Sequence, residues 1–180
     1  VKEVGANVTN VSVGDHVTVN PVCSCGTCRV CLKGRGNVCA NLRVIGVHVD
    51  GGYREFVKVP SKNVFKVDPK IPWDKAAVIE PYTVAAEVTW RGGVQEGDIV
   101  LICGSGQIAL TILQVCNLLG AKCIMTDLVD NRLKRAEEFG AWKTINSGSE
   151  DVIAAVKGLT DGIGADVAID AACVGKTLEQ

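Results

Sequence analysis

The sequence predicts an α/β protein in which a β-rich first half with a cysteine-rich lobe precedes a partial doubly wound parallel sheet. Three observations predict this organisation. Four cysteines lie within residues 25–39, strand-like apolar runs separated by turn residues fill residues 11–67, and strands alternate with helices after residue 95. Such strand–helix alternation is typical of a parallel sheet covered by helices.

Composition and charge exclude several classes of protein. The formal net charge is −1, so the basic excess of a nucleic-acid-binding protein is absent. No apolar run approaches the roughly 20 residues that cross a bilayer. Nine cysteines and no export signal at the first residues favour a reducing compartment. We therefore expect a cytoplasmic protein with neither a nucleic-acid nor a membrane partner.

The stretch "SCGTCRVCLKGRGNVCAN" has the spacing C-x2-C-x2-C-x7-C, formed by Cys25, Cys28, Cys31 and Cys39. Disulfides fit poorly, because neighbours this close in the chain close no useful loop. An iron–sulfur cluster fits the first three cysteines, but the last gap is too long and Ala40 replaces the expected proline. Tetrahedral zinc on four thiolates fits best, as a closed structural site. The alternative is a set of free thiols.

The other cysteines lie mostly in apolar runs and match no ligand spacing. We expect them to pack as small apolar side chains. They are Cys23, Cys103, Cys116, Cys123 and Cys173.

A glycine-rich turn follows the apolar strand predicted over residues 99–103. Gly104, Gly106 and Ala109 form G-x-G-x-x-A, in which the first glycine permits a tight turn and the second lets the backbone approach a pyrophosphate. The helix that starts here directs free N–H groups and a positive dipole end at the phosphates. The cofactor-binding residues predicted in this turn are Gly104, Gly106, Gln107, Ile108 and Ala109.

An acidic residue ends the next predicted strand. Asp127 lies 23 residues after Gly104, close to the spacing of about 20 expected for a carboxylate that binds the adenosine ribose. Because no arginine follows directly, NAD is favoured over NADP. The alternative is that Asp127 only caps a turn, with Asp130 as the N-cap of the following helix. Arg132 could stack on adenine or be a solvated surface cation.

The alternation continues to the last residues. Residues 142–146 read as a strand, 149–160 as an amphipathic helix, 165–175 as a fourth strand running into a loop and 175–180 as the start of another helix. This order predicts consecutive parallel strands in one sheet.

The region before the glycine turn has two patterns. Residues 11–21, 43–60 and 63–69 read as β-structure with turns, in which Val-Gly-Asp and Gly51-Gly52 are hairpin or bend signals, whereas residues 72–93 read as helical. Glu80 lies within this apolar helical stretch, where a carboxylate is costly unless it is paired or bound to a metal. Alternatively, Glu80 lies at a helix start with Pro81 as the first helical residue.

Together these motifs resemble the zinc-dependent medium-chain dehydrogenase/reductase family, in its alcohol, polyol and L-threonine dehydrogenase branch. "CGTCRVCLKGRGNVC" is similar to the zinc lobe of that family. "GVHVDGGYREFVKVP" and "IEPYTVAAEV" are most similar to starvation-sensing and L-galactonate-type dehydrogenases. The resemblance implies a partial GroES-like catalytic domain over residues 1–87, with a structural-zinc lobe at 23–40, and a partial NAD-binding Rossmann domain over 88–180.

The resemblance also implies roles in hydride transfer between a secondary alcohol and NAD. Glu80 would face a catalytic zinc, His48 and Tyr53 would border the substrate cleft, and Val84 would border the nicotinamide. The substrate would be a small alcohol such as a polyol, a sugar acid or an L-threonine-like compound. For the complete protein we expect a homo-oligomer.

The sequence departs from the family in two places. Gln107 and Ala109 replace the usual proline and last glycine of the turn. More importantly, the cysteine and the Gly-His-Glu segment that hold the family's catalytic zinc are absent. We therefore expect an internal portion of a longer dehydrogenase that is inactive alone. The alternative is a non-catalytic module that binds NAD and zinc.

Overall fold

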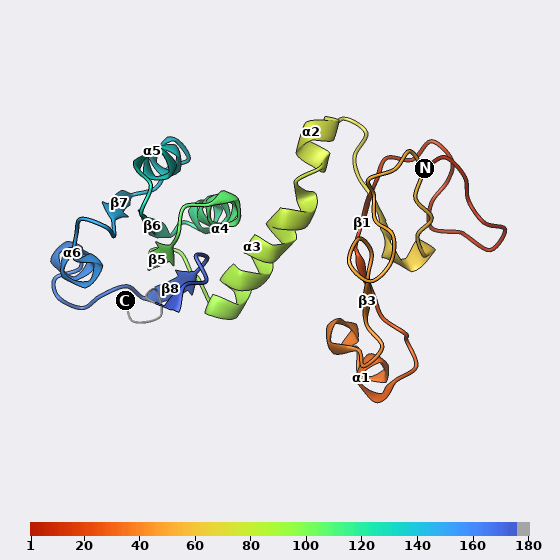
Figure 1. Cartoon of the computed structure of the whole chain (residues 1–180), viewed down its shortest axis with the longest axis horizontal. Coiled ribbons are helices and arrows are strands. Elements are labelled where there is room, and N and C mark those ends of the chain that lie inside the picture. Colours follow the sequence, from red (N-terminus) through yellow and green to blue (C-terminus); the bar gives the residue numbers. More distant parts are fainter. Residues whose placement is uncertain (176–180) are drawn as a thin grey trace. The chain divides into compact units, whose positions relative to one another are not determined.

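The computed structural model describes residues 1–175, and most of its helices and strands are labelled in Figure 1. The chain divides into two compact units, Val1–Glu80 and Pro81–Gln180. The division falls inside α3 (Ile79–Gly92), which lies within the stretch 72–93 that the sequence predicts to be helical. We call these parts unit 1 and unit 2 and describe each by itself.

Unit 1 contains two small antiparallel sheets, each of two strands. One pairs β1 (Val17–Val19) with β4 (Val64–Lys66), and the other pairs β2 (Val22–Cys23) with β3 (Arg43–Val44). The remaining elements of unit 1 are short helices: α1 (Arg29–Leu32), a 3₁₀ turn at Gly36–Val38, a second at Ser61–Asn63, and α2 (Trp73–Ala76).

Residues 43–60 were predicted to form β-structure with a hairpin or bend at Gly51-Gly52, and the bend is present while most of the strand is not. Only Arg43–Val44 joins a sheet, and the chain then bends back on itself. The backbones of Gly46 and Gly51 come together there, so that a Cβ atom on Gly51 would lie 2.7 Å from the Gly46 Cα atom. The alternation of apolar and polar residues predicted strand structure here. Most of this stretch forms no strand, because no partner strand lies beside it among the described residues.

Unit 2 is built on a four-stranded parallel sheet with the order β7-β6-β5-β8. Its strands are β5 (Ile99–Cys103), β6 (Lys122–Asp127), β7 (Lys143–Asn146) and β8 (Val167–Asp170). The connecting helices are α4 (Gln107–Leu118), α5 (Asp130–Glu138) and α6 (Val152–Leu159). The structure thus confirms the predicted α/β organisation and the parallel strands.

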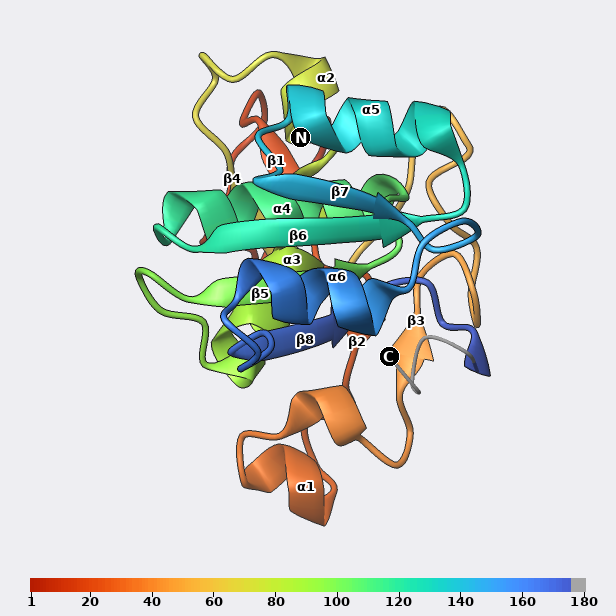
Figure 2. The same cartoon turned by 90° about the vertical axis from the view of Figure 1, so that its left-hand side faces the viewer.

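Two apolar layers cover the sheet. Successive residues of β6 face opposite sides, so Met125 packs with α4 residues such as Leu113, while Ile124 packs with Val152 of α6. In Figure 2, α3 and α4 lie behind the sheet and α6 lies in front of it. The carboxyl ends of β5 and β6 are held rigidly by this core, which positions the glycine turn and Asp127.

Several helix boundaries differ from the prediction. Pro81 is the third residue of α3 rather than the first. Asp130 is the first residue of α5, and the residue at its N-cap is Val129. α6 has a side-chain cap, because the carboxylate of Asp151 accepts a hydrogen bond from the Ala154 N–H at 3.0 Å. The helix predicted from residue 175 onward lies outside the described residues.

None of the described helices combines the length and the apolar character needed to span a membrane.

Candidate functional site

The four thiols of the predicted lobe converge on one point. Cys25 and Cys28 flank the turn that leads into α1, Cys31 lies within α1, and Cys39 follows the first 3₁₀ turn. Their sulfur atoms lie within 4.8 Å of one another. The Cys25–Cys39 and Cys28–Cys31 sulfur pairs are 3.4 Å apart, and the Cys25–Cys31 and Cys28–Cys39 pairs are 3.9 and 3.8 Å apart.

This spacing fits a single tetrahedral ion. A Zn–S bond of about 2.3 Å places neighbouring sulfurs of a tetrahedron about 3.8 Å apart. The observed separations lie on both sides of that value. A cluster of several iron atoms needs its sulfur ligands further apart, so the geometry favours one zinc ion over an iron–sulfur cluster. All four ligand positions are thiols, which leaves no position for water or substrate.

Backbone N–H groups point at the sulfurs. The Cys28 N–H donates to the Cys25 sulfur at 3.4 Å, and the Asn41 N–H donates to the Cys39 sulfur at 3.3 Å. Hydrogen bonds from the backbone of Thr27 and Cys28 lower the pKa of the Cys25 thiol to about 5. Desolvation, followed by the adjacent Cys28 thiol, raises the pKa of Cys31 to about 12. A bound cation would draw all four groups toward the thiolate form.

The remaining cysteines only partly follow the prediction. Cys103, Cys116 and Cys123 are buried in unit 2, as expected, and Cys23 is half-buried in β2. Cys173 is exposed rather than packed, with a positive φ of 55° after β8. The sequence predicts that the fourth strand runs into a loop here, but not that Cys173 adopts a left-handed backbone conformation.

The glycine turn of unit 2 has the geometry that the G-x-G-x-x-A pattern predicts. Gly104 has a φ of +98°, and a Cβ atom there would lie 3.1 Å from the Ala172 nitrogen. Gly106 faces open space and is the N-cap of α4. The N–H groups of residues 107–109 have no hydrogen-bond partner among the described residues. A phosphate could therefore approach this backbone closely.

Asp127 links the glycine turn to the end of β6. Its Oδ2 atom accepts a hydrogen bond from the Ser105 N–H at 2.9 Å, and its Oδ1 atom accepts one from the Val129 N–H at 3.0 Å. The guanidinium of Arg132 lies 3.6 Å from Oδ2. The Asp127 side chain is 8% exposed. Asp127 thus holds a turn, as the alternative interpretation proposed, and its ribose-binding role stays a prediction.

Ser105 is a residue of this site that the sequence analysis missed. Its backbone N–H binds Asp127 and its hydroxyl donates to the Thr126 carbonyl oxygen at 3.2 Å. Its position between Gly104 and Gly106 was the sequence feature that could have identified Ser105 as part of this site. Ser105 ties the two strand ends together and therefore fixes where the open amides of α4 point.

Three residues were assigned to catalysis from the resemblance, and a fourth, Val84, was assigned to the nicotinamide. His48 and Tyr53 are exposed on the loop after β3, and the His48 Nδ1 atom accepts a hydrogen bond from the Val44 N–H at 3.0 Å. Glu80 is exposed in the first turn of α3, followed one turn later by Val84. Among the described residues, the four cysteines are the only His, Cys, Asp and Glu group close enough to hold a metal. The roles of these four residues stay predictions.

A surface cavity of about 530 Å³ lies in unit 1, between residues 14–16 and 66–69. It contains none of the residues that the sequence assigned to a site. The cavity therefore does not locate the predicted dinucleotide and metal sites. The evidence for these sites is the backbone geometry of the glycine turn and the cluster of four thiols.

Comparison with known proteins matches both units. Residues 1–69 match the family described as the alcohol dehydrogenase GroES-like domain, and residues 108–180 match the family described as zinc-binding dehydrogenase. The starvation-sensing protein RspB of Escherichia coli K12 is 43% identical over 173 residues, which are 94% of this chain and 50% of the relative. An L-threonine 3-dehydrogenase of Pyrococcus abyssi is 37% identical over 100% of this chain and 52% of the relative.

Solved structures give the same result. A short chain alcohol dehydrogenase, rspB, of Escherichia coli CFT073 in complex with NADH superposes with a TM-score of 0.88, at 42% identity over 95% of this chain and 51% of that chain. A protein of Sinorhizobium meliloti 1021, described as a zinc-binding dehydrogenase and bound to NADP, has a TM-score of 0.93 at 35% identity over 99% of this chain and 53% of that chain. The chain thus spans about half the length of the relatives it matches.

Proposed function

The chain belongs to the zinc-dependent medium-chain dehydrogenase family, and from that premise we propose that its protein transfers a hydride between a secondary alcohol and NAD. The observation that carries this proposal is the glycine turn of unit 2. There, open N–H groups at the start of α4 lie beside a carboxylate at the end of β6. This combination suits a pyrophosphate and a ribose diol in one ligand.

We assign the pyrophosphate to the backbone of residues 104–109 and the adenosine ribose to Asp127. Gly106 leaves room for the phosphate oxygens, and the dipole of α4 favours their negative charge. The Asp127 carboxylate accepts hydrogen bonds from ribose hydroxyls and repels a 2′-phosphate, which favours NAD. Arg132 partly offsets that repulsion, because it lies 3.6 Å from the same carboxylate. Because the Asp127 carboxylate is the group that repels the 2′-phosphate, its loss should narrow the preference for NAD over NADP.

In the lobe, Cys25, Cys28, Cys31 and Cys39 would hold one structural zinc ion. The site is closed, so its contribution is to the folding of unit 1 rather than to the reaction. The N–H groups that donate to the sulfurs disperse the excess negative charge of four thiolates.

The residues proposed to surround the alcohol and the nicotinamide are assigned from the family resemblance. Glu80 would lie near the catalytic metal, His48 and Tyr53 would line the cleft for a polyol, sugar acid or L-threonine-like substrate, and Val84 would pack against the nicotinamide. A catalytic zinc would supply a Lewis acid that lowers the pKa of the alcohol. Such a site needs about three protein ligands. The described residues contain no such group besides the four cysteines.

We therefore expect the 180-residue chain to bind NAD and not to oxidise alcohols by itself. The test is to assay the chain with zinc, NAD⁺ and a panel of polyols, L-threonine and sugar acids, beside a chimera in which the chain replaces the matched region of Escherichia coli RspB. NADH formation by the chimera only, lost on Glu80→Ala, is the expected result. NADH formation by the short chain would contradict the proposed location of the catalytic metal.

The second candidate is a non-catalytic module that binds NAD and zinc. It is favoured by the same observation that only one metal-binding group exists among the described residues. The two candidates separate in the chimera, because a binding module would give saturable NADH binding there and no turnover with any alcohol.

A further inference from the structure

A hydrogen bond between two side chains joins α3 to α4 within unit 2. The hydroxyl of Tyr82 on α3 donates to the Gln114 Oε1 atom on α4 at 2.9 Å. The Nε2 atom of the same glutamine donates to the Leu110 carbonyl oxygen at 3.0 Å. Because both ends of the Gln114 amide are engaged, the direction in which its oxygen points is fixed.

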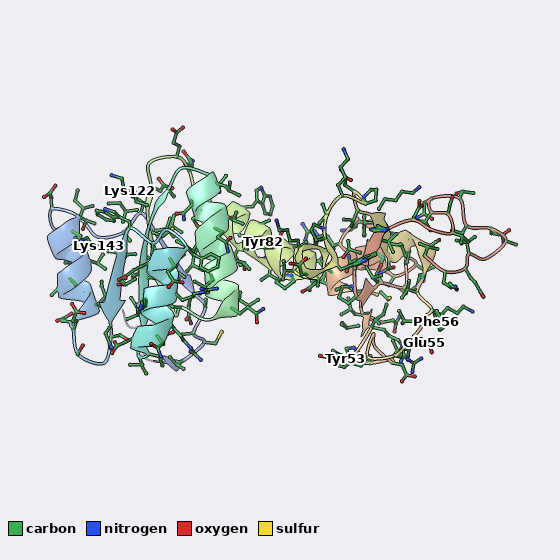
Figure 3. The ribbon with its side chains drawn as sticks, turned by 90° about the horizontal axis from the view of Figure 1, so that it is seen from above. Tyr53, Glu55, Phe56, Tyr82, Lys122 and Lys143 are labelled. Atoms are coloured by element: carbon green, nitrogen blue, oxygen red, sulfur yellow. The ribbon has the colours of Figure 1, made fainter. Side chains whose placement is uncertain are left out.

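The series of hydrogen bonds continues to the glycine turn. The Leu110 N–H donates to the Gly106 carbonyl oxygen at 3.0 Å, and Gly106 is the N-cap of α4. Tyr82 is therefore linked through Gln114 and Leu110 to a residue of the turn that we assign to the pyrophosphate. Figure 3 labels Tyr82 on α3.

The same face of α3 also packs against the core through apolar contact. Tyr82, Ala85 and Thr89 share this face, because residues three and four apart are neighbours on a helix. Ala85 is fully buried in the same apolar cluster as Leu113 of α4, and the Thr89 hydroxyl donates to the Ala85 carbonyl oxygen at 3.0 Å. Apolar contact has no preferred direction, whereas a hydrogen bond weakens steeply when it is bent. The bond between Tyr82 and Gln114 therefore restricts small rotations of α3 that apolar packing would tolerate.

We propose that Tyr82 is a positioning residue for hydride transfer, because its bond to Gln114 fixes Val84 relative to the glycine turn. This inference rests on the proposed function, which assigns Val84 to the nicotinamide and the glycine turn to the pyrophosphate. Val84 follows Tyr82 by two residues on α3 and is 39% exposed, so its side chain is accessible to a ligand.

The reaction makes the relative position of α3 and α4 important. The pyrophosphate and the nicotinamide belong to one ligand, so a shift of α3 moves Val84 against the ring while the phosphates stay in place. A displacement of about 1 Å can slow a reaction about a hundredfold. The Tyr82 hydroxyl has no assigned contact with the cofactor. Its loss should therefore lower the rate of hydride transfer more than the affinity for NADH.

Tyr82→Phe removes the hydroxyl and keeps the ring, and Thr89→Val is the matched control. In the RspB chimera, Tyr82→Phe should slow single-turnover hydride transfer about tenfold, while the KM for the alcohol and the Kd for NADH stay within about twofold. Thr89→Val removes a hydroxyl that bonds within α3, so it should leave that rate within about twofold even where unit 2 becomes less stable. An unchanged rate in Tyr82→Phe, or equal losses in the two variants, would show that Tyr82 only stabilises α3 and would overturn the proposal.

A double-mutant cycle tests whether Tyr82 acts through Gln114. Gln114→Met keeps the length of the side chain and removes the acceptor, so it should slow hydride transfer as much as Tyr82→Phe does. The double variant should then be no slower than either single variant. Gln114→Glu retains an oxygen acceptor for the hydroxyl and should recover most of the rate. Losses that multiply in the double variant would contradict a shared role.

Nuclear Overhauser contacts test the geometry without turnover. In the chimera with ¹³C-labelled valine methyl groups and saturating NADH, the Val84 methyl groups should contact the nicotinamide ring protons, and Val84→Ala identifies their signals. This contact should weaken in Tyr82→Phe and persist in Thr89→Val. Absence of the contact in the unsubstituted chimera, or full strength in Tyr82→Phe, would overturn the proposal.

The two measurements separate this inference from the proposed function. An inactive chimera in which the Val84 contact depends on Tyr82 would keep the inference and remove the proposed reaction. An active chimera whose hydride transfer does not respond to Tyr82→Phe would keep the reaction and remove the inference.

Discussion

The two units of this chain are stabilised by different means. Among its described residues, unit 2 buries twenty apolar side chains, nineteen of which form clusters on the two faces of a parallel sheet. Unit 1 buries two apolar residues, and the four thiols of its lobe lie within 4.8 Å of one another. A polypeptide of similar length can therefore be organised by apolar burial in one part and by metal ligands in the other. Removal of the metal should therefore affect unit 1 most, and truncation of buried apolar side chains should affect unit 2 most.

The largest effect should come from removing the metal. Structural zinc contributes on the order of 10 kcal/mol to the folding of small zinc domains, and unit 1 has no core to replace it. Chelation under reducing conditions should unfold the lobe and leave the unit 2 amide resonances in place. Elemental analysis of the untreated chain should find about one zinc and no iron.

Cys28→Ser should reproduce this loss, with Cys23→Ser as the matched control. Cys23 is half-buried in β2 and lies outside the thiol cluster. Iron with inorganic sulfide in the purified chain, or equal effects of the two substitutions, would show that the cluster is not a four-thiolate zinc site.

The next effect should come from the core of unit 2. Leu113 of α4 is fully buried, and Leu118 on the same helix is 86% exposed. Leu113→Ala should lower the free energy of unfolding of unit 2 by about 2–5 kcal/mol, because it removes apolar contacts and leaves a cavity. Leu118→Ala should change it by less than about 0.5 kcal/mol. Urea denaturation followed by far-UV circular dichroism measures both, and similar values would contradict the layered core.

A smaller effect should separate cofactor binding from stability. Asp127→Asn removes the charge and leaves one oxygen acceptor for the two turn N–H groups. NADH affinity should therefore fall about tenfold, while NADPH affinity should rise because the repulsion of the 2′-phosphate is lost. Asp127→Ala also loses the acceptor for the Ser105 and Val129 N–H groups and should destabilise unit 2. Asp130→Asn is the control on the following helix. A wild-type preference for NADPH, measured by fluorescence titration, would show that Asp127 only holds the turn.

The smallest effect should come from the cap of α6. Asp151→Ala removes the acceptor for the Ala154 N–H and should cost about 1 kcal/mol of unit 2 stability. Asp151→Ser, which retains a capping oxygen, should recover most of that loss. If Asp151→Ala proved neutral in thermal unfolding, the cap would contribute nothing measurable.

The parts of the structure that could be predicted from the sequence are those determined by neighbours in the chain. The turn at Gly104 and Gly106 is encoded within a few residues, and so is the approach of Cys25, Cys28 and Cys31. The parallel strands follow from a local alternation of strand and helix patterns. These features needed no knowledge of distant contacts.

The sequence-based predictions failed where the local structure depends on contacts between residues that are distant in the chain. Residues 43–60 have strand-like alternation, but a strand forms only when a partner segment lies beside it, and most of this region has none among the described residues. The sequence could not decide whether Asp127 binds a ribose or caps a turn for the same reason. Its hydrogen bond with Ser105 joins the ends of two strands that are distant in the chain. The roles of Glu80, His48 and Tyr53 came from resemblance and await functional tests.

The central claim is that each unit holds its own cofactor, unit 1 a zinc ion and unit 2 the dinucleotide. The most direct measurement is a titration of NADH into the 180-residue chain before and after the metal has been removed under reducing conditions. The account predicts saturable binding in both samples, with dissociation constants that agree within about twofold, as expected for sites without shared partners. Loss of NADH binding on removal of the metal, or absence of binding in the metal-loaded chain, would contradict it.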